Sequence, residues 1–175
     1  MGVRRIKMFS VNEYVVYSTV GICRIVDFKK ERFGSSAEKN YYILEPVHLK
    51  NSYIYVPADN KVATGKMQPV LTAEEVYTLL DSVSNEEIPW ISNDTQRREK
   101  YYQIIKSGDR KEILKLIKTL YRQKQKRFAS GRKFYAADQH ILNTAERLIH
   151  NEFALALKIK PEDVMPFILN QLKAR

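Results

Sequence analysis

Residues 9–33 read FSVNEYVVYSTVGICRIVDFKKERF, and their alternation of apolar and polar side chains decides the fold of the first part of the chain. The stretch is rich in residue types that favour strands, and Gly21 interrupts it. KNYYILEPVH (39–48) and SYIYVPADN (52–60) follow after polar turns. Such closely spaced short strands predict a small antiparallel barrel or a strongly bent sheet. Pro57 ends its run and fits an edge strand, since proline cannot donate a ladder hydrogen bond.

Near residue 70, the spacing of apolar residues changes from the alternation typical of strands to the spacing typical of helices. Thr72 and Glu75 predict a capping box ahead of a short helix, and the polar, acidic residues 82–89 resemble a linker. Further helices are predicted from about Thr95 to Ser107–Gly108, from the Asp109–Glu112 capping pair onward, over residues 136–157, and from a start between Pro161 and Pro166. The sequence thus predicts an α+β protein with a β domain over 1–70, a short helix and linker over 71–89, and an all-α domain over 90–175.

The positive charge of the chain is concentrated in one block. The formal net charge is +10, and residues 96–133 hold fourteen lysines and arginines against three acidic residues. A local basic excess favours a polyanionic partner, with nucleic acid as the first candidate and an acidic membrane surface as the second. Binding to a membrane surface would normally require large apolar residues beside the charge for insertion, and no apolar run reaches the roughly 18 residues that a span requires, so we expect no membrane partner.

The residue patterns of most enzymes are missing. The six glycines form no phosphate-binding loop, the three histidines are scattered, and the single cysteine, Cys23, cannot form a two-cysteine metal site. Acidic pairs lie at predicted helix starts or in the linker, where the helix dipole explains most of them. We therefore expect no enzymatic activity, no metal, no cofactor and no small-molecule substrate.

Cysteine usage and the basic start indicate the compartment. MGVRRIKMFSV lacks the apolar core of a signal peptide, and Cys23 is predicted to be a buried strand residue without a disulfide. A reducing cytoplasm is the expected location.

The order of the sequence blocks resembles the CarD/CdnL family of bacterial transcription regulators. In the β part, MFSVNEYVVYSTVGICRI, YYILEP and YIYVP are similar to family strands. In the helical part, IPW, IIKSGDRKEILKLIKTLY and ILNTAERLIHNEFALAL follow in the family order. The resemblance implies a Tudor/SH3-like β-barrel domain that binds the RNA polymerase β subunit, followed by a helical domain that binds promoter DNA. It also implies that the protein stabilises the open complex and that it is associated with the nucleoid through RNA polymerase.

The resemblance assigns a role to Trp90, the only tryptophan. In the family, a tryptophan at this place wedges into the minor groove at the upstream edge of the melted −10 region. From the residues alone, the favoured interpretation of Trp90 is a core residue that anchors the linker to the helical domain. A flat aromatic that opens a base step reads deformability and not base identity.

The candidate contact residues form two sets, and a further basic group has no single assigned role. The DNA-binding set consists of Trp90, Arg97, Arg98, Lys100, Lys124, Lys126, Arg127, Arg132 and Lys133. The polymerase-binding set consists of Lys29, Lys30, Arg32, Tyr53, Ile54, Tyr55 and Pro57, around a predicted edge strand. A third group, Lys111, Lys115, Lys118 and Arg122, falls on one helix face, which either contacts DNA or is simply a solvated face.

The chain departs from the family pattern at several positions. Asn12–Glu13 replaces Gly–Asp, and Ser18 replaces the usual proline. Arg97 follows Trp90 by seven positions, where three are usual, so a short insertion separates them. Glu99 stands where lysine is common, and Tyr135 where a helix-capping serine is common.

Two other function classes remain as alternatives. The first is a non-enzymatic protein–protein adaptor with no direct DNA role. Binding to DNA that weakens steeply as salt rises would favour the DNA-binding interpretation over it, because electrostatic binding has this salt dependence. An enzyme that acts on nucleic acid would show cleavage that depends on divalent metal.

Overall fold

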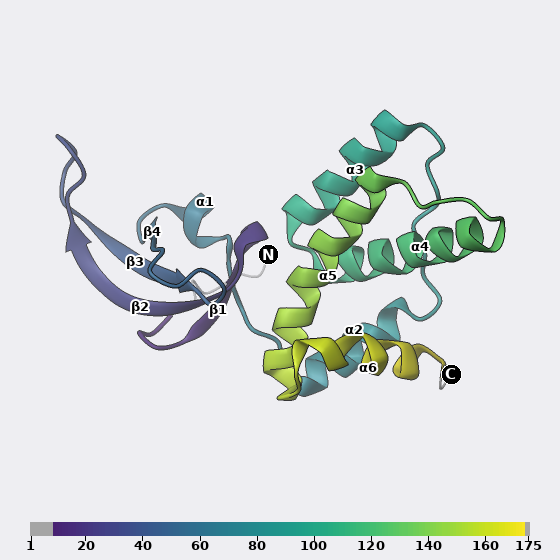
Figure 1. Cartoon of the computed structure of the whole chain (residues 1–175). Coiled ribbons are helices and arrows are strands. Elements are labelled where there is room, and N and C mark those ends of the chain that lie inside the picture. The colour runs from purple at the N-terminus through teal and green to yellow at the C-terminus, as the bar shows by residue number, and fades with distance from the viewer. Residues whose placement is uncertain (1–8, 174–175) are drawn as a thin grey trace, which may run out of the picture. The chain divides into compact units, whose positions relative to one another are not determined.

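The computed structural model describes residues 9–173 (Figure 1), so the basic start at residues 1–8 lies outside the described part. The chain divides into two compact units, Met1–Val70 and Leu71–Arg175. The residues 71–89, expected to form a separate connection, group with the helical unit. The reason is that their short helix contributes three buried side chains to the helical core.

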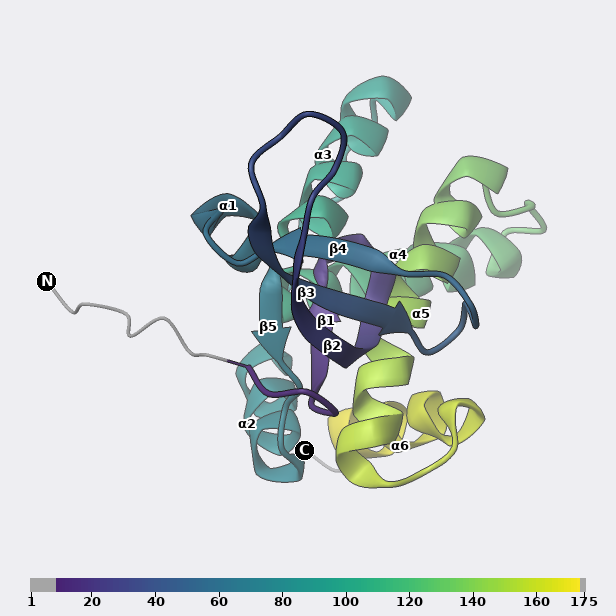
Figure 2. The ribbon, with the colours of Figure 1, turned by 90° about the vertical axis from the view of Figure 1, so that its left-hand side faces the viewer.

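The first unit is an antiparallel sheet. Its elements are β1 (Tyr14–Tyr17), the 3-10 turn η1 (Ser18–Val20), β2 (Gly21–Glu31), β3 (Lys39–Pro46), β4 (Ile54–Pro57), α1 (Lys61–Thr64) and β5 (Met67–Pro69). The strand order is β4-β3-β2-β1-β5, so β4 and β5 are the two edges (Figure 2). The predicted antiparallel strands and the edge position of the YIYVP run are both confirmed, whereas β5 and α1 were not predicted.

Two local features bend this sheet. Gly21 has a φ of 92°, which a residue with a side chain rarely adopts, and it turns the chain from η1 into β2. The register between β2 and β3 shifts between Ile25 and Asp27, as at a β-bulge. A bulge increases local twist, so the long strand β2 curves around the core.

The core of the first unit lies on one side of the bent sheet and includes Val15, Cys23, Ile25, Leu44 and Val56. Cys23 has no exposed surface, as the sequence predicted. Burial raises the pKa of its thiol to about 11, so the thiol stays protonated at neutral pH. Cys23 therefore serves as a small apolar core residue.

Within the described residues, the second unit contains five helices: α2 (Ala73–Val83), α3 (Asp94–Ser107), α4 (Arg110–Ala129), α5 (Ala136–Leu157) and α6 (Pro161–Lys173). The predicted capping box of Thr72 and Glu75 is formed, and Asp109 caps α4. Gly108 ends α3 in the left-handed conformation with a φ of 67°. No helix within the described residues is long and apolar enough to cross a membrane.

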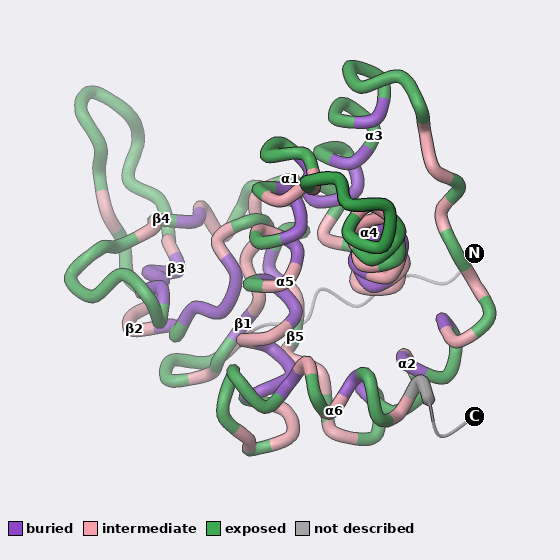
Figure 3. The backbone as a smooth tube through the Cα atoms, turned by 45° about the vertical axis from the view of Figure 1, so that its right-hand side comes forward, coloured by how far each residue is buried: buried purple, intermediate pink, exposed green. Residues whose placement is uncertain are grey.

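Helix α5 is the central element of this unit, and Figure 3 shows buried residues along its length. Its apolar stripe includes Ile141, Leu142 and Ile149. Two carboxylates, Asp138 and Glu152, are also almost completely buried on it. A buried carboxylate requires a cation or hydrogen-bond donors, and the partners of Asp138 shape the candidate site.

Candidate nucleic-acid interface

Trp90 lies in the segment between α2 and α3. The residue is half-buried, and its side chain packs against the hydrophobic core of the helical unit. The guanidinium carbon of Arg97 lies 4.4 Å from the ring centre. Packing of Trp90 on the core is therefore observed, as one interpretation of the sequence expected, although the residue is not fully buried.

Arg97 is held in place from several sides. Its Nε and Nη2 donate to the two carboxylate oxygens of Asp138 over 3.1 and 3.0 Å, and Nη2 lies 2.8 Å from Asp94. Nη1 donates to the carbonyl of Ile91 over 2.9 Å and, at 3.4 Å, to that of Ser92. Burial alone lowers the pKa of Arg97, but the hydrogen bonds to the two aspartates outweigh this effect and raise it. The guanidinium is thus a fixed positive charge beneath the indole.

The structure does not support the direct DNA contact predicted for Arg97. Only 2% of the residue is exposed, and all three guanidinium nitrogens have protein partners. A phosphate would have to displace buried hydrogen bonds to reach it, and breaking a buried ion pair is costly. The geometry instead makes Arg97 a support for Trp90 and for the two carbonyls that follow it.

Tyr135 extends this arrangement and was not predicted as a site residue. The guanidinium carbons of Arg97 and Arg127 lie 5.4 and 3.9 Å from the Tyr135 ring centre. Arg127 also donates from Nε to the carbonyl of Lys133 over 2.7 Å. Trp90, Arg97, Tyr135 and Arg127 therefore form a series in which aromatic rings and guanidinium groups alternate, with Tyr135 40% exposed.

The other predicted DNA-binding cations lie at the surface. Arg98 and Lys100 are exposed on α3, and Arg98 donates to the carbonyl of Asp94 over 3.3 Å. At the end of α4 and in the loop after it, Lys126, Arg132 and Lys133 are exposed, and Lys124 is half-buried with its ammonium 6.0 Å from the Phe128 ring centre. These side chains are able to reach phosphates without breaking a buried contact.

The basic stripe of α4, defined as Lys111, Lys115, Lys118 and Arg122, has a different environment. Each of its members contacts residues between Val83 and Glu87, on the acidic segment that precedes Trp90. The stripe is therefore neither a bare solvated face nor a free surface for phosphates.

The predicted polymerase-binding residues lie around edge strand β4. Register pairing aligns Lys29 with Tyr41 and Tyr41 with Pro57, so the three residues form one row across β2, β3 and β4. Lys29, Tyr53 and Tyr55 line an open hollow of about 490 Å³. Lys30 and Arg32 are exposed, whereas Ile54 is half-buried against the sheet core.

Aromatic rings that the sequence did not single out enlarge this surface. Phe33 lies with its ring centre 5.2 Å from those of Tyr41 and Tyr55, in edge-to-face geometry. Lys29 pairs with Glu31 over 2.8 Å, so its charge is partly balanced. The edge strand thus adjoins a mixed aromatic and basic face, a composition typical of protein–protein contacts.

Nothing in the described part of the chain gathers three or more histidine, cysteine, aspartate or glutamate side chains into a site able to hold a metal ion. The buried carboxylates have other partners: Asp138 binds Arg97, and Glu152 accepts two hydrogen bonds of 2.7 Å from Arg110. Glu152 also accepts from the backbone N–H of Leu71. These carboxylates connect the helices to one another.

The structure thus combines a bent antiparallel sheet that has a short edge strand with a helical unit in which Trp90 stacks on Arg97. Residues 9–71 match the family model described as the CarD-like/TRCF RID domain, and residues 75–168 match the CarD C-terminal domain. These matches define the protein as a transcription regulator that interacts with RNA polymerase. The chain belongs to the CarD family. A comparison with curated proteins gave no match.

Proposed function

We propose that this protein binds the RNA polymerase β subunit through its first unit and promoter DNA through its second, and thereby stabilises the open complex. Trp90 is the proposed wedge in the minor groove at the upstream edge of the melted region. The observation that carries this proposal is the stack of Trp90 on a buried arginine. The half-buried Trp90 thereby gains a rigid support, in a unit whose sequence carries a basic excess.

The preference for the open state follows from the energetics of base stacking. Insertion of an aromatic wedge into closed duplex costs roughly a few kcal/mol for each unstacked step. At the edge of a melted region that step is already disrupted, so the wedge binds there with less cost. A ligand shifts an equilibrium by its differential affinity for the two states, so tighter binding to melted DNA favours the open complex.

The exposed cations supply a second, less selective contribution. Arg98, Lys100, Lys126, Arg132 and Lys133 are placed at the surface, where phosphate contacts give affinity and position without reading sequence. One short basic surface binds DNA weakly by itself. Attachment to polymerase through the first unit raises the effective concentration of the second near the promoter, which offsets that weakness.

The test is the lifetime of promoter open complexes formed by the cognate RNA polymerase. The full-length protein, its Trp90→Ala variant and a reaction without protein are compared, with Tyr102→Ala as the control for loss of an exposed aromatic on the neighbouring helix α3. We expect the wild type and the control to lengthen the lifetime and Trp90→Ala to lose most of the effect while it still binds polymerase. Equal open-complex lifetimes with the wild type and Trp90→Ala would rule out the wedge role of Trp90. If the wild type does not change the lifetime, the adaptor alternative is favoured.

A further inference from the structure

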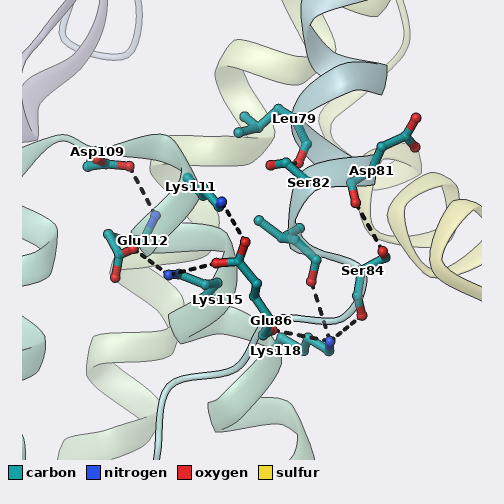
Figure 4. A network of polar contacts seen from close by, with 11 residues as sticks. Leu79, Asp81, Ser82, Ser84, Glu86, Asp109, Lys111, Glu112, Lys115 and Lys118 are labelled. Carbon is teal, nitrogen blue, oxygen red and sulfur yellow. Dashed lines mark hydrogen bonds and ion pairs between the residues drawn. The ribbon is translucent and has the colours of Figure 1, made fainter.

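The acidic segment before Trp90 occupies the basic stripe of α4 (Figure 4). The Lys111 ammonium lies 2.6 Å from the Glu86 carboxylate, and the Lys115 ammonium lies 3.3 Å from its other oxygen. Arg122 binds the Glu87 carboxylate. Two consecutive carboxylates thus face the stripe, and their charges offset part of its positive potential.

Lys118 contributes in a different way, because its ammonium donates to the backbone of the same segment. Its Nζ lies 2.6 Å from the carbonyl oxygen of Ser84, 3.3 Å from that of Glu86 and 3.4 Å from that of Val83. Carbonyls at a helix C-terminus lack partners within the helix and carry partial negative charge. Lys118 therefore fixes the direction in which the chain leaves α2.

Neutral contacts complete the attachment closer to the tryptophan. The Thr119 hydroxyl accepts from the Ile88 N–H over 3.3 Å and donates to the Ile88 carbonyl over 3.0 Å. On the other side of Trp90, Arg97 binds the carbonyls of Ile91 and Ser92. The indole is consequently held between an upstream attachment on α4 and a downstream attachment on α3.

These two attachments differ in how far their charged side chains are exposed to solvent. Arg97 and Asp138 are buried, whereas Glu86 and Glu87 are well exposed, with side chains 44% and 39% accessible. Exposed ion pairs are individually weak and are screened by salt, but several that act on one short segment add up. A loop that inserts an aromatic ring binds better when its bound conformation is already ordered.

We propose that Glu86 and Glu87 are positioning residues for Trp90. By occupying the basic stripe of α4, they hold the segment 84–89 in the conformation that presents the indole to DNA. The inference rests on the wedge function proposed above and extends it. It means that the basic stripe of α4 binds the chain's own segment 84–89, and that ion pairs between the two hold the indole in the position that contacts DNA.

Because Trp90 is the only tryptophan, its fluorescence reports directly on this segment. Acrylamide quenching is measured on the full-length protein for wild type and for Glu86→Gln/Glu87→Gln. The matched control is Glu38→Gln/Glu162→Gln, which removes the same charge from two exposed positions outside the acidic segment. We expect stronger quenching in Glu86→Gln/Glu87→Gln and unchanged quenching in the control. Loss of a few exposed ion pairs should make the segment open about fivefold more often.

A charge exchange separates positioning from a general loss of stability. Arg122→Glu should raise quenching by repulsion from Glu87, and Arg122→Glu/Glu87→Arg should return it toward the wild-type value. Unchanged quenching in Glu86→Gln/Glu87→Gln, with native circular dichroism, overturns the positioning role whether or not the wedge function is correct.

Open-complex lifetimes then connect the segment to function. Glu86→Gln/Glu87→Gln should shorten the lifetime in the wild-type background and have no further effect in the Trp90→Ala background. A loss that persists without the indole shows that the glutamates act elsewhere. A longer lifetime with tighter DNA binding shows that they compete with DNA for the stripe. Either result overturns the inference, whereas failure of the wedge function appears separately, as a Trp90→Ala variant that behaves as wild type.

Discussion

The guanidinium carbon of Arg97 lies 4.4 Å from the centre of the Trp90 ring, and the same guanidinium forms a two-point ion pair with Asp138 of α5. The proposed wedge is therefore supported by a charge that is itself locked to the central helix. Asp138 of α5 and the indole of Trp90 thus contact the same guanidinium, and we expect a displacement of α5 at Asp138 to reach the indole through it. Presentation of the wedge and stability of the helical unit are coupled through this pair.

Removal of Asp138 should destabilise the helical unit strongly. In Asp138→Ala, Arg97 is left charged and almost fully buried, and loss of one partner of such a pair costs about 3–5 kcal/mol. Urea unfolding monitored by circular dichroism measures the change in the free energy of unfolding. Arg97→Met/Asp138→Leu removes both charges and should recover part of the loss, so a double variant less stable than the single one would contradict this account.

The exposed cations should determine the salt dependence of DNA binding. Arg132→Gln and Lys133→Gln should each reduce the slope of log K against log salt by about one, the value for one lost phosphate contact. Lys160→Gln removes an exposed charge outside this surface and should leave the slope unchanged. Titration of a labelled promoter fragment at several salt concentrations gives the slopes. Equal slopes for all variants would place the phosphates elsewhere.

Tyr135 should contribute by its ring and not as a helix cap. It precedes α5 without a side-chain capping hydrogen bond. In Tyr135→Ser, the new cap should add about 1 kcal/mol to the free energy of unfolding. The loss of stacking on two guanidinium groups should remove a similar amount. The free energy of unfolding should change little, whereas acrylamide quenching of Trp90 should increase as Arg97 becomes less confined. Tyr135→Phe keeps the ring and should match the wild type in both measurements.

The acid sensitivity of the helical unit should depend on His150. Burial lowers the pKa of this histidine below its usual 6.5, and Glu146 only partly offsets the effect. The unfolded chain therefore binds a proton at this histidine more readily than the folded chain does. The contribution of His150 to the free energy of unfolding is fully present above about pH 6.5, and it is lost as the pH falls through the folded-state pKa. Melting temperatures of wild type and His150→Gln at pH 7.5 and 5.5 test this, and the variant should lose less on acidification.

The aromatic face beside β4 should carry much of the affinity for polymerase. Tyr53 precedes the edge strand and Tyr55 lies on it, and both side chains are exposed. Aromatic anchors at interface centres often contribute about 2 kcal/mol or more. Tyr53→Ala/Tyr55→Ala should weaken binding to the β subunit by about tenfold or more. Val62→Ala, on α1, removes another exposed apolar side chain and serves as the control. Equal weakening by both would indicate a non-specific effect.

Features governed by neighbouring residues were predictable from the sequence. The Thr72–Glu75 box, the Gly108 cap and the span of α5 follow from local rules of capping and periodicity, and the structure shows all three. The edge position of β4 followed from Pro57, because proline restricts where a strand lies in a sheet. Two short elements, α1 and β5, have too few residues to show a period.

Side-chain partners distant in the sequence were not predictable. Arg97 and Asp138 are 41 positions apart, and Lys118 is 34 from Ser84, so only the packed helices bring them together. One signal was nevertheless available. Asp138 and Glu152 fall at helical spacing on the apolar stripe of α5, and carboxylates on a buried face require cationic partners.

Both edge strands of the sheet end in proline, β4 at Pro57 and β5 at Pro69. Each edge is also very short, with four and three residues. Short edges that end in a residue without an N–H group resist the sheet-to-sheet association by which exposed strands aggregate. The first unit is thereby able to keep an edge accessible for a partner and still remain dispersed at high concentration. Replacement of either proline by a strand-forming residue therefore risks self-association even where the fold is unchanged.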